Sequence, residues 1–258
     1  MPVECGIGYC EASGRKEEAY QALLTYHVPI ATNVMRRWPF GGFCYYLIDC
    51  NAGTGIIPES GTPGSPLVAL EVFRQLGLMN PANRQSKKPM PSFSLQLIER
   101  RQRNATLLKE VIAGFQPQFP ADCVCSVHVA DNAQAAPMIC TQIGKTAHGL
   151  LYQDATQVPN WEMLGAANQA CPRLDQLIWI NPVAIRRSRV HGAPTLLQGM
   201  RLAGKQRWMV LAPDLQSRWR SSFLLGTNAP EGTFRNWQKY QWWDVRGAEG
   251  QAILQELR

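Results

Sequence analysis

The sequence predicts an α/β fold with a mostly parallel sheet of seven strands and helices on both faces. Two observations lead to it. Short apolar runs alternate with helical segments through the first five strands. The last two apolar runs, 207–213 and 221–228, are joined by about seven residues, which is too short for a helical crossover. We therefore expect these two strands to pair as an antiparallel C-terminal hairpin.

The elements can be placed in order along the chain. Residues 15–37 have apolar residues at helical spacing, interrupted by Pro29, and Ser13 is expected to cap this segment. The first strand follows at 43–49, and the next helix is expected to have Ser65 as its cap and Pro66 at its first position. The remaining expected elements are a polar loop at 80–91, strands at 92–99, 123–131, 149–154 and 175–181, and helices at 100–115 and 160–170. We divide the chain into an N-terminal helical segment, 1–40, and an α/β domain, 41–258.

The composition indicates a globular protein and gives no sign of a membrane-spanning segment. The chain has 258 residues, of which 45% are hydrophobic and 17% charged, as in globular proteins. No apolar run approaches the ~20 residues that a membrane span needs. The start of the sequence lacks the basic and then apolar pattern of a signal peptide, so we expect a cytoplasmic protein with no membrane association.

The eight cysteines do not predict a disulfide framework, because the chain is long and their spacing is not dense. Cys5, Cys10 and His27 are the one grouping that suggests a metal, but their spacing matches no established zinc motif. We therefore expect no metal site.

Acidic residues end three successive predicted strands. Asp49 ends the first and is followed by Asn51-Ala52-Gly53-Thr54-Gly55, Glu99 ends the second, and Asp131 ends the third. In an open parallel sheet, ligands bind beyond the carboxyl ends of the strands. An acid before a small glycine turn suits a cationic nucleoside such as S-adenosylmethionine, and Glu99 suits ribose hydroxyls. The alternatives are a tight turn that needs glycine, a solvated Glu99 paired with Arg100 or Arg103, and a helix cap at Asp131.

The fourth and fifth strands end in Asp154 and in Asn181-Pro182. A carboxylate at Asp154 suits a hydrogen bond to, or a proton from, a substrate group, and Asn181 suits a hydrogen bond. Amino-group methyltransferases of DNA use an Asn/Asp-Pro-Pro-aromatic turn, whereas Val183 and Ala184 follow Pro182 here. The alternative is an ordinary chain turn.

The positive charge lies in the last third of the chain. Residues 172–258 hold 13 Lys/Arg and 6 Asp/Glu, a difference of +7, which is the whole net charge. Such a bias indicates a polyanionic partner, nucleic acid first, or else a solvated face. The expected nucleic-acid-binding residues are Arg186, Arg187, Arg189, Arg218 and Arg220. Tryptophans interleaved with the basic residues suit base stacking or, alternatively, core packing; they are Trp208, Trp219, Trp237, Trp242 and Trp243.

Several stretches together resemble the three-Cys-motif partner proteins, methyltransferase-like proteins of bacteria and their phages or plasmids. The matching stretches are YYLIDCNAGTG (45–55), GSPLVAL (64–70), Glu99, GLLYQDATQVPNWEML (149–164), LIWINPVAIRR (177–187) and SFLLGTNAPEG (222–232). Two departures are Asn51-Ala-Gly-Thr-Gly in place of Phe-Ala-Gly-Pro-Gly, and Asp154-Ala-Thr-Gln in place of Asp-Pro-x-Gly.

The resemblance implies a Rossmann-like class I methyltransferase fold that binds S-adenosylmethionine. It implies that the turn from Asp49 to Gly55 holds the methionine part, Glu99 the ribose, and that Asp131 flanks the adenine. It also implies a partner protein of the radical-SAM kind. Our first hypothesis is a methyltransferase acting on a base nitrogen of nucleic acid, with adenine N6 as a candidate. The alternatives are a non-catalytic protein that binds DNA or a partner enzyme, and a methyltransferase for proteins or small molecules.

Overall fold

The computed structural model describes residues 7–37, 43–58, 60–78, 91–115, 123–154, 158–190, 192–213, 221–234 and 237–257. Within these ranges, side chains are described from residue 16 onward, except at 77 and 78. The chain forms two compact units, Met1–Asn132 and Ala133–Arg258. The proposed boundary near residue 40 stays a prediction, and the expected loop at 80–91 lies almost wholly outside the described residues.

The first unit is a three-stranded parallel sheet with its helices. Its elements are α1 (Ile7–Arg37), β1 (Cys44–Asp49), α2 (Ser65–Leu78), β2 (Ser92–Glu99), α4 (Gln102–Phe115) and β3 (Cys123–Val129). The strands lie in the order β3-β2-β1, and Asp49 is in register with Leu97, as Glu99 is with Val129. The expected strands at 43–49 and 92–99 are confirmed to within one residue.

Helix α1 continues through its proline. Pro29 has no N–H to donate to the preceding turn, yet the helix runs unbroken for 31 residues. The hydroxyls of Thr25 and Thr32 donate to the carbonyls of Gln21 and Val28. Ser13 lies inside this helix and does not cap it, because the helix begins six residues earlier, at Ile7.

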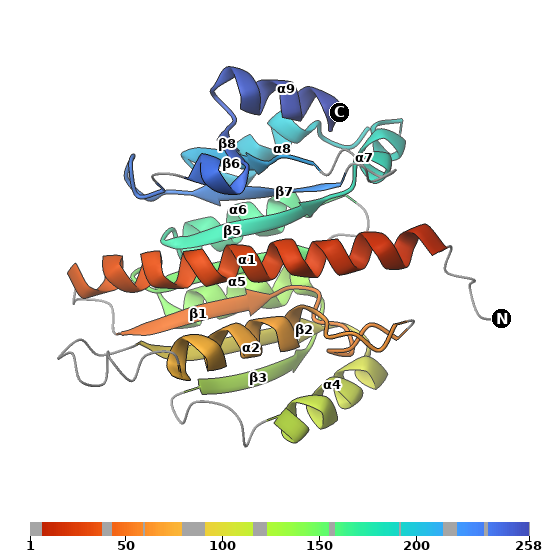
Figure 1. The fold of residues 1–258 in the computed structure, drawn as a ribbon, viewed down its shortest axis with the longest axis vertical. Helices are drawn as coiled ribbons and strands as arrows, with labels where there is room; N and C mark the ends of the chain where they lie inside the picture. Colours follow the sequence, from red (N-terminus) through yellow and green to blue (C-terminus); the bar gives the residue numbers. More distant parts are fainter. Residues whose placement is uncertain are drawn as a thin grey trace. The chain divides into compact units, whose positions relative to one another are not determined.

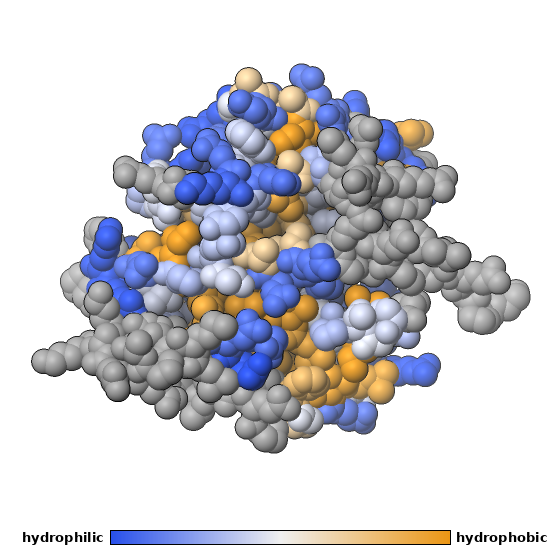
Figure 2. Space-filling view, in the orientation of Figure 1, coloured by the Kyte–Doolittle hydropathy of each residue, from blue (hydrophilic) through white to orange (hydrophobic). Residues whose placement is uncertain are grey.

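Aromatic side chains join the helices of the first unit to its sheet. Phe73 of α2 stacks on Phe93 of β2 with ring centroids 4.4 Å apart, and meets Tyr45 of β1 edge-on. The buried His27 of α1 shares a 2.8 Å hydrogen bond with the Tyr45 hydroxyl. Helices α1 and α2 therefore pack together on the Tyr45 face of the sheet (Figure 1). Apolar surface is visible over α4 in Figure 2. The exposed large apolar side chains of α4 are Leu107, at 41%, and Phe115, at 40%.

The second unit is a mixed five-stranded sheet with the order β4-β5-β7-β6-β8. Its elements are α5 (Asn132–Ile143), β4 (His148–Asp154), α6 (Trp161–Ala170), β5 (Leu174–Ile180), α7 (Pro182–Arg189), α8 (Leu196–Ala203), β6 (Arg207–Leu211), β7 (Ser222–Thr227), η3 (Trp237–Tyr240), β8 (Trp242–Asp244) and α9 (Ala248–Glu256). Strands β4 and β5 are parallel, and β7 is antiparallel to both β5 and β6. The antiparallel C-terminal hairpin is confirmed.

Two parts of the expected fold are corrected. The described residues form eight strands rather than seven, because β8 pairs antiparallel with β6 through Trp242–Asp244. All three antiparallel pairings lie in the second unit, whose sheet is therefore mixed, whereas the sheet of the first unit is parallel as expected. Strand β8 has three residues, too few for an alternation of apolar and polar side chains to be recognised in the sequence. Among the described helices, none is both long and apolar enough to cross a membrane.

Candidate functional site

The carboxyl ends of β1, β2 and β3 are tied together by hydrogen bonds. The Ala52 amide donates to the Ile98 carbonyl at 3.0 Å, and the Ala130 amide donates to the Glu99 carbonyl at 3.3 Å. The Asn132 side chain donates to the Cys50 carbonyl at 3.1 Å. The turn after β1 is therefore bonded to the end of β2 and to Asn132, the first residue of α5, which follows β3.

Asp49 is fully buried, and its carboxylate holds the chain rather than facing solvent. Oδ1 accepts from the Asn51 amide at 2.9 Å, and Oδ2 accepts from the Ser65 hydroxyl at 2.6 Å. Burial, and next the charge of Asp49, raises the pKa of Tyr20 well above its usual value. Asp49 thus connects the glycine turn to the first residue of α2. Ser65, expected as a cap before the helix, is instead its first residue.

The glycine turn has two positions that disfavour a side chain for different reasons. Gly53 has φ +62°, and a Cβ there would meet nothing within 4 Å. Gly55 has φ +79°, and a Cβ there would lie 2.9 Å from Leu108 of α4. The Thr54 hydroxyl donates to the Ile56 carbonyl, and the Gly64 amide donates to the Gly55 carbonyl at 2.9 Å, which holds Gly64 against the turn. The turn is fixed in place, with open space at Gly53.

Glu99 and Asp131 lie where a ligand can reach them. Glu99 is half-buried, and its Oε1 accepts from the Arg101 amide at 2.7 Å. Among the described residues its Oε2 has no hydrogen bond, and it pairs with neither Arg100 nor Arg103. Asp131 is exposed. Asp49, Leu97 and Glu99 share one face because registered residues of parallel strands point the same way.

The ends of β4 and β5 form a second edge, in the second unit. Asp154 is half-buried and in register with Trp179, so Asp154 and Asn181 lie at the same end of this strand pair. Asn181 Oδ1 accepts from the amides of Val183 and Ala184 at 3.0 and 3.3 Å, and Pro182 occupies the first turn of α7. Asn181 and Pro182 therefore start the helix, as these residue types commonly do.

Helix α7 presents a basic surface. Arg186, Arg187 and Arg189 are exposed, and none has an ion-pair partner among the described residues. Val190, which follows them, is 82% exposed. Arg218 and Arg220 lie outside the described residues, so their expected role stays a prediction.

Three tryptophans of the basic third, residues 172–258, lie in the hydrophobic core. Trp208, Trp237 and Trp242 are at most 5% exposed, so the core-packing alternative is confirmed for these three, and they offer no face for base stacking. Each packs in an aromatic or glycine-lined contact. Trp237 meets Phe234 and Trp242 edge-on, and Trp208 lies against Gly226. Trp219 lies outside the described residues.

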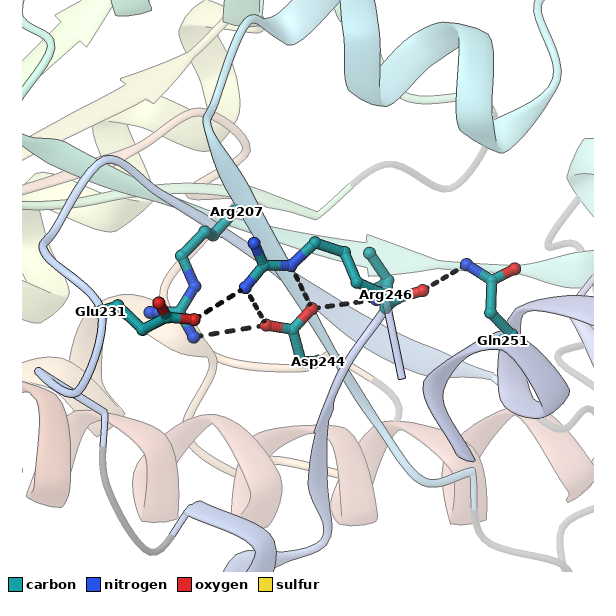
Figure 3. A network of polar contacts seen from close by, with 6 residues as sticks. Arg207, Glu231, Asp244, Arg246 and Gln251 are labelled. Carbon is teal, nitrogen blue, oxygen red and sulfur yellow. Dashed lines mark hydrogen bonds and ion pairs between the residues drawn. The ribbon is translucent and has the colours of Figure 1, made fainter. Parts of the chain in front are cut away.

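A compact ion network neutralises two of the arginines (Figure 3). Arg246 donates to both oxygens of Asp244, Arg207 lies 3.3 Å from Asp244, and Glu231 contacts Arg246 at 3.3 Å. The Arg246 hydrogen bonds lower the pKa of Asp244 to about 2. The charge of this network is internally balanced, so it contributes little to any polyanion-binding surface.

The described cysteines and histidines do not form a metal site. The described cysteines form no disulfide; they are Cys44, Cys50, Cys123, Cys125, Cys140 and Cys171. Burial raises the pKa of Cys123 to about 11 and of Cys125 to about 12, which favours the protonated form. In the described part of the chain, no three His, Cys, Asp or Glu side chains gather to hold an ion. Cys5 lies outside the described residues, and His27 is bonded to Tyr45.

Comparisons with solved structures find remote likenesses. A protein from Legionella pneumophila has a TM-score of 0.46 at 12% identity, over 82% of this chain and 86% of that one. A fibrillarin/Nop5p complex has a TM-score of 0.42 at 14% identity, over 71% of this chain and 72% of that one. A SAM-dependent methyltransferase from Agrobacterium tumefaciens has a TM-score of 0.42 at 12% identity, over 79% and 61%. Likenesses this remote do not assign a fold family or an activity. No protein-family model and no curated protein sequence matches the chain.

Proposed function

We propose that the protein is an S-adenosylmethionine-dependent methyltransferase acting on a base nitrogen of nucleic acid, with adenine N6 as the candidate position. The observation that carries the proposal is the hydrogen-bonded gathering of the ends of β1, β2 and β3 around the Gly53–Gly55 turn. Crevices at the carboxyl ends of parallel strands are the usual ligand sites of α/β sheets. The resemblance to three-Cys-motif partner proteins, with its radical-SAM partner, belongs to this proposal.

The residues at this edge suit the cofactor. Glu99 Oε2, which has no hydrogen bond among the described residues, suits an acceptor for the two ribose hydroxyls. Gly53 leaves open space beside the turn. Asp131 is exposed and suits a place beside the adenine. Asp49 acts indirectly, by fixing the Asn51–Gly55 turn. When bound, this cofactor supplies an electrophilic methyl group, and the chain's part is to bind and orient it.

The second unit offers groups for a substrate. In the proposal Asp154 accepts a hydrogen bond or a proton, while Asn181 and Pro182 position the start of α7. Arg186, Arg187 and Arg189 then bind phosphates, as exposed arginines without ion pairs are suited to do. A base within a duplex has to be flipped out of the stack before its nitrogen can react.

One observation favours the second candidate, a non-catalytic protein that binds DNA or a partner enzyme. The Asn181 oxygen, which would accept from a substrate amino group, already accepts from two amides of α7. A protein that binds DNA or a partner enzyme without catalysing methyl transfer does not need the Asn181 oxygen for a substrate.

Calorimetry with S-adenosylmethionine tests the cofactor site. We expect micromolar binding by the unmodified protein and at least tenfold weaker binding by Glu99→Gln. Glu110→Gln, an exposed glutamate of α4, is the matched control and should bind normally. No binding at millimolar ligand would overturn the proposal. A labelled-methyl assay on DNA, RNA and protein pools then separates the three hypotheses.

A further inference from the structure

A cluster of positive charge lies in the first unit, outside the basic third of the sequence. Arg100, Arg101 and Arg103 are all exposed, directly after the end of β2. None has an ion pair or a side-chain hydrogen bond with another described residue. We call these three residues the α4 arginine patch.

The nearest acid in sequence does not neutralise this patch. Glu99 uses Oε1 to accept from the backbone amide of Arg101 and not from a guanidinium. The first turn of α4 contains no acidic residue. Cations near the amino end of a helix are disfavoured by the positive end of the helix dipole. The fold thus gains nothing visible from the patch, which is a common mark of a surface kept for a partner.

The backbone that carries the patch is fixed. The Ala105 amide donates to the Arg101 carbonyl at 3.0 Å, and Ala105 and Leu108 anchor α4 in the core. In Figure 1 the start of α4 follows the end of β2, which is bonded to the turn after β1. The three guanidinium groups therefore extend from a rigid support beside the proposed cofactor edge.

We propose that the α4 arginine patch binds the phosphodiester backbone of a nucleic acid, as a contact surface separate from α7. Arginine binds phosphate oxygens with paired, charge-assisted hydrogen bonds, and three residues within four positions suit consecutive phosphates. The inference names the partner of the proposed function and rests on its nucleic-acid part, but not on methyl transfer.

Fluorescence anisotropy with labelled single-stranded and duplex oligonucleotides, over a series of salt concentrations, tests the proposal. The test variant is R100Q/R101Q/R103Q. The matched control is K145Q/R201Q/K239Q, which removes three exposed charges from the second unit. Loss of three phosphate contacts should reduce the slope of log affinity against log salt by about 2 to 3, and weaken binding at least tenfold at low salt. The control should keep most of the slope. Thermal melting checks that both variants fold.

Equal affinity and equal slope for the test variant and the control would overturn the inference. So would the absence of nucleic-acid binding by the unmodified protein. Calorimetry with S-adenosylmethionine on the same samples separates the two proposals. Retained cofactor binding without nucleic-acid binding defeats this inference and the nucleic-acid part of the proposed function but leaves methyl transfer standing. Loss of cofactor binding with intact salt-dependent binding of nucleic acid defeats methyl transfer alone.

Discussion

Each unit buries a charged residue, and the two are satisfied differently. Asp49, in the first unit, is fully buried and accepts from one amide and one hydroxyl. Lys205, in the second, is 7% exposed and donates to the carbonyls of Pro172 and Leu174 at 3.0 and 2.5 Å. Asp49 lies at the carboxyl end of its strand, the edge at which open α/β sheets usually bind ligands. Lys205 is hydrogen-bonded at the amino end of β5, so its ammonium group is held inside the fold and is not a polyanion contact.

The second unit also contains buried polar side-chain atoms that have no hydrogen-bond partner among the described residues. Gln153 Oε1, Gln176 Oε1 and Trp161 Nε1 are buried with no hydrogen bond among the described residues. A buried polar group without a hydrogen bond lowers the stability of the folded state. A buried polar group that is hydrogen-bonded lowers it only when a substitution removes its partner. The comparison therefore predicts opposite outcomes for removing paired and unpaired groups.

The largest effect is expected for Asp49→Ala. The substitution leaves the Ser65 hydroxyl and the Asn51 amide without their acceptor, and should lower the free energy of unfolding by about 4 kcal/mol. Urea denaturation measures it. The exposed Glu110→Ala should change stability by less than about 0.5 kcal/mol. Equal stability of Asp49→Ala and the unmodified protein would show that Asp49 does not hold the turn.

Lys205 should make stability depend on pH. Burial lowers its pKa to about 8, below its ordinary value of 10.5. Between these values the unfolded chain binds more protons, so the free energy of unfolding should rise with pH, by on the order of 3 kcal/mol in all. Below about pH 8 this contribution is absent. Denaturation of the unmodified protein and of Lys205→Met at pH 7.5 and 10 measures the difference, and parallel pH profiles would contradict it.

The two turn glycines should differ. Gly55→Ala combines a positive φ with a 2.9 Å approach to Leu108, so we expect a loss of about 2 kcal/mol. Gly53→Ala has the positive φ alone and should cost about 1 kcal/mol. Thermal or urea unfolding measures the stability of both variants, and the difference between them gives the cost of the close approach to Leu108. A Gly53→Ala variant as unstable as Gly55→Ala would mean that the space at Gly53 is filled.

The smallest effect is expected for Gln153→Leu. Because Gln153 Oε1 is buried without a partner, its removal should be neutral or stabilising, within about 1 kcal/mol. A loss similar to that of Asp49→Ala, measured by the same denaturation, would show that Gln153 has a bound partner such as an internal water.

The strands that the sequence predicted best are long and strongly patterned. Residues 92–99 and 43–49 alternate or run apolar between clear turns, and the structure places β2 and β1 there. Helices α7, α8 and α9 and strand β8 are short, with three to nine residues, and periodicity says little over such lengths. The meeting of three strand ends was predictable because parallel strands share a carboxyl edge.

The sequence by itself determined the alternation of strands and helices, the antiparallel hairpin and the acids that end successive strands, because these depend on local pattern and connection length. Only the tertiary structure decided which charges are available. It buried Asp49, Lys205 and three tryptophans, paired Arg207 and Arg246 with Asp244, and left the α4 arginine patch exposed. A residue's type sets its charge, whereas its burial and its hydrogen-bond partners depend on residues that are distant along the chain.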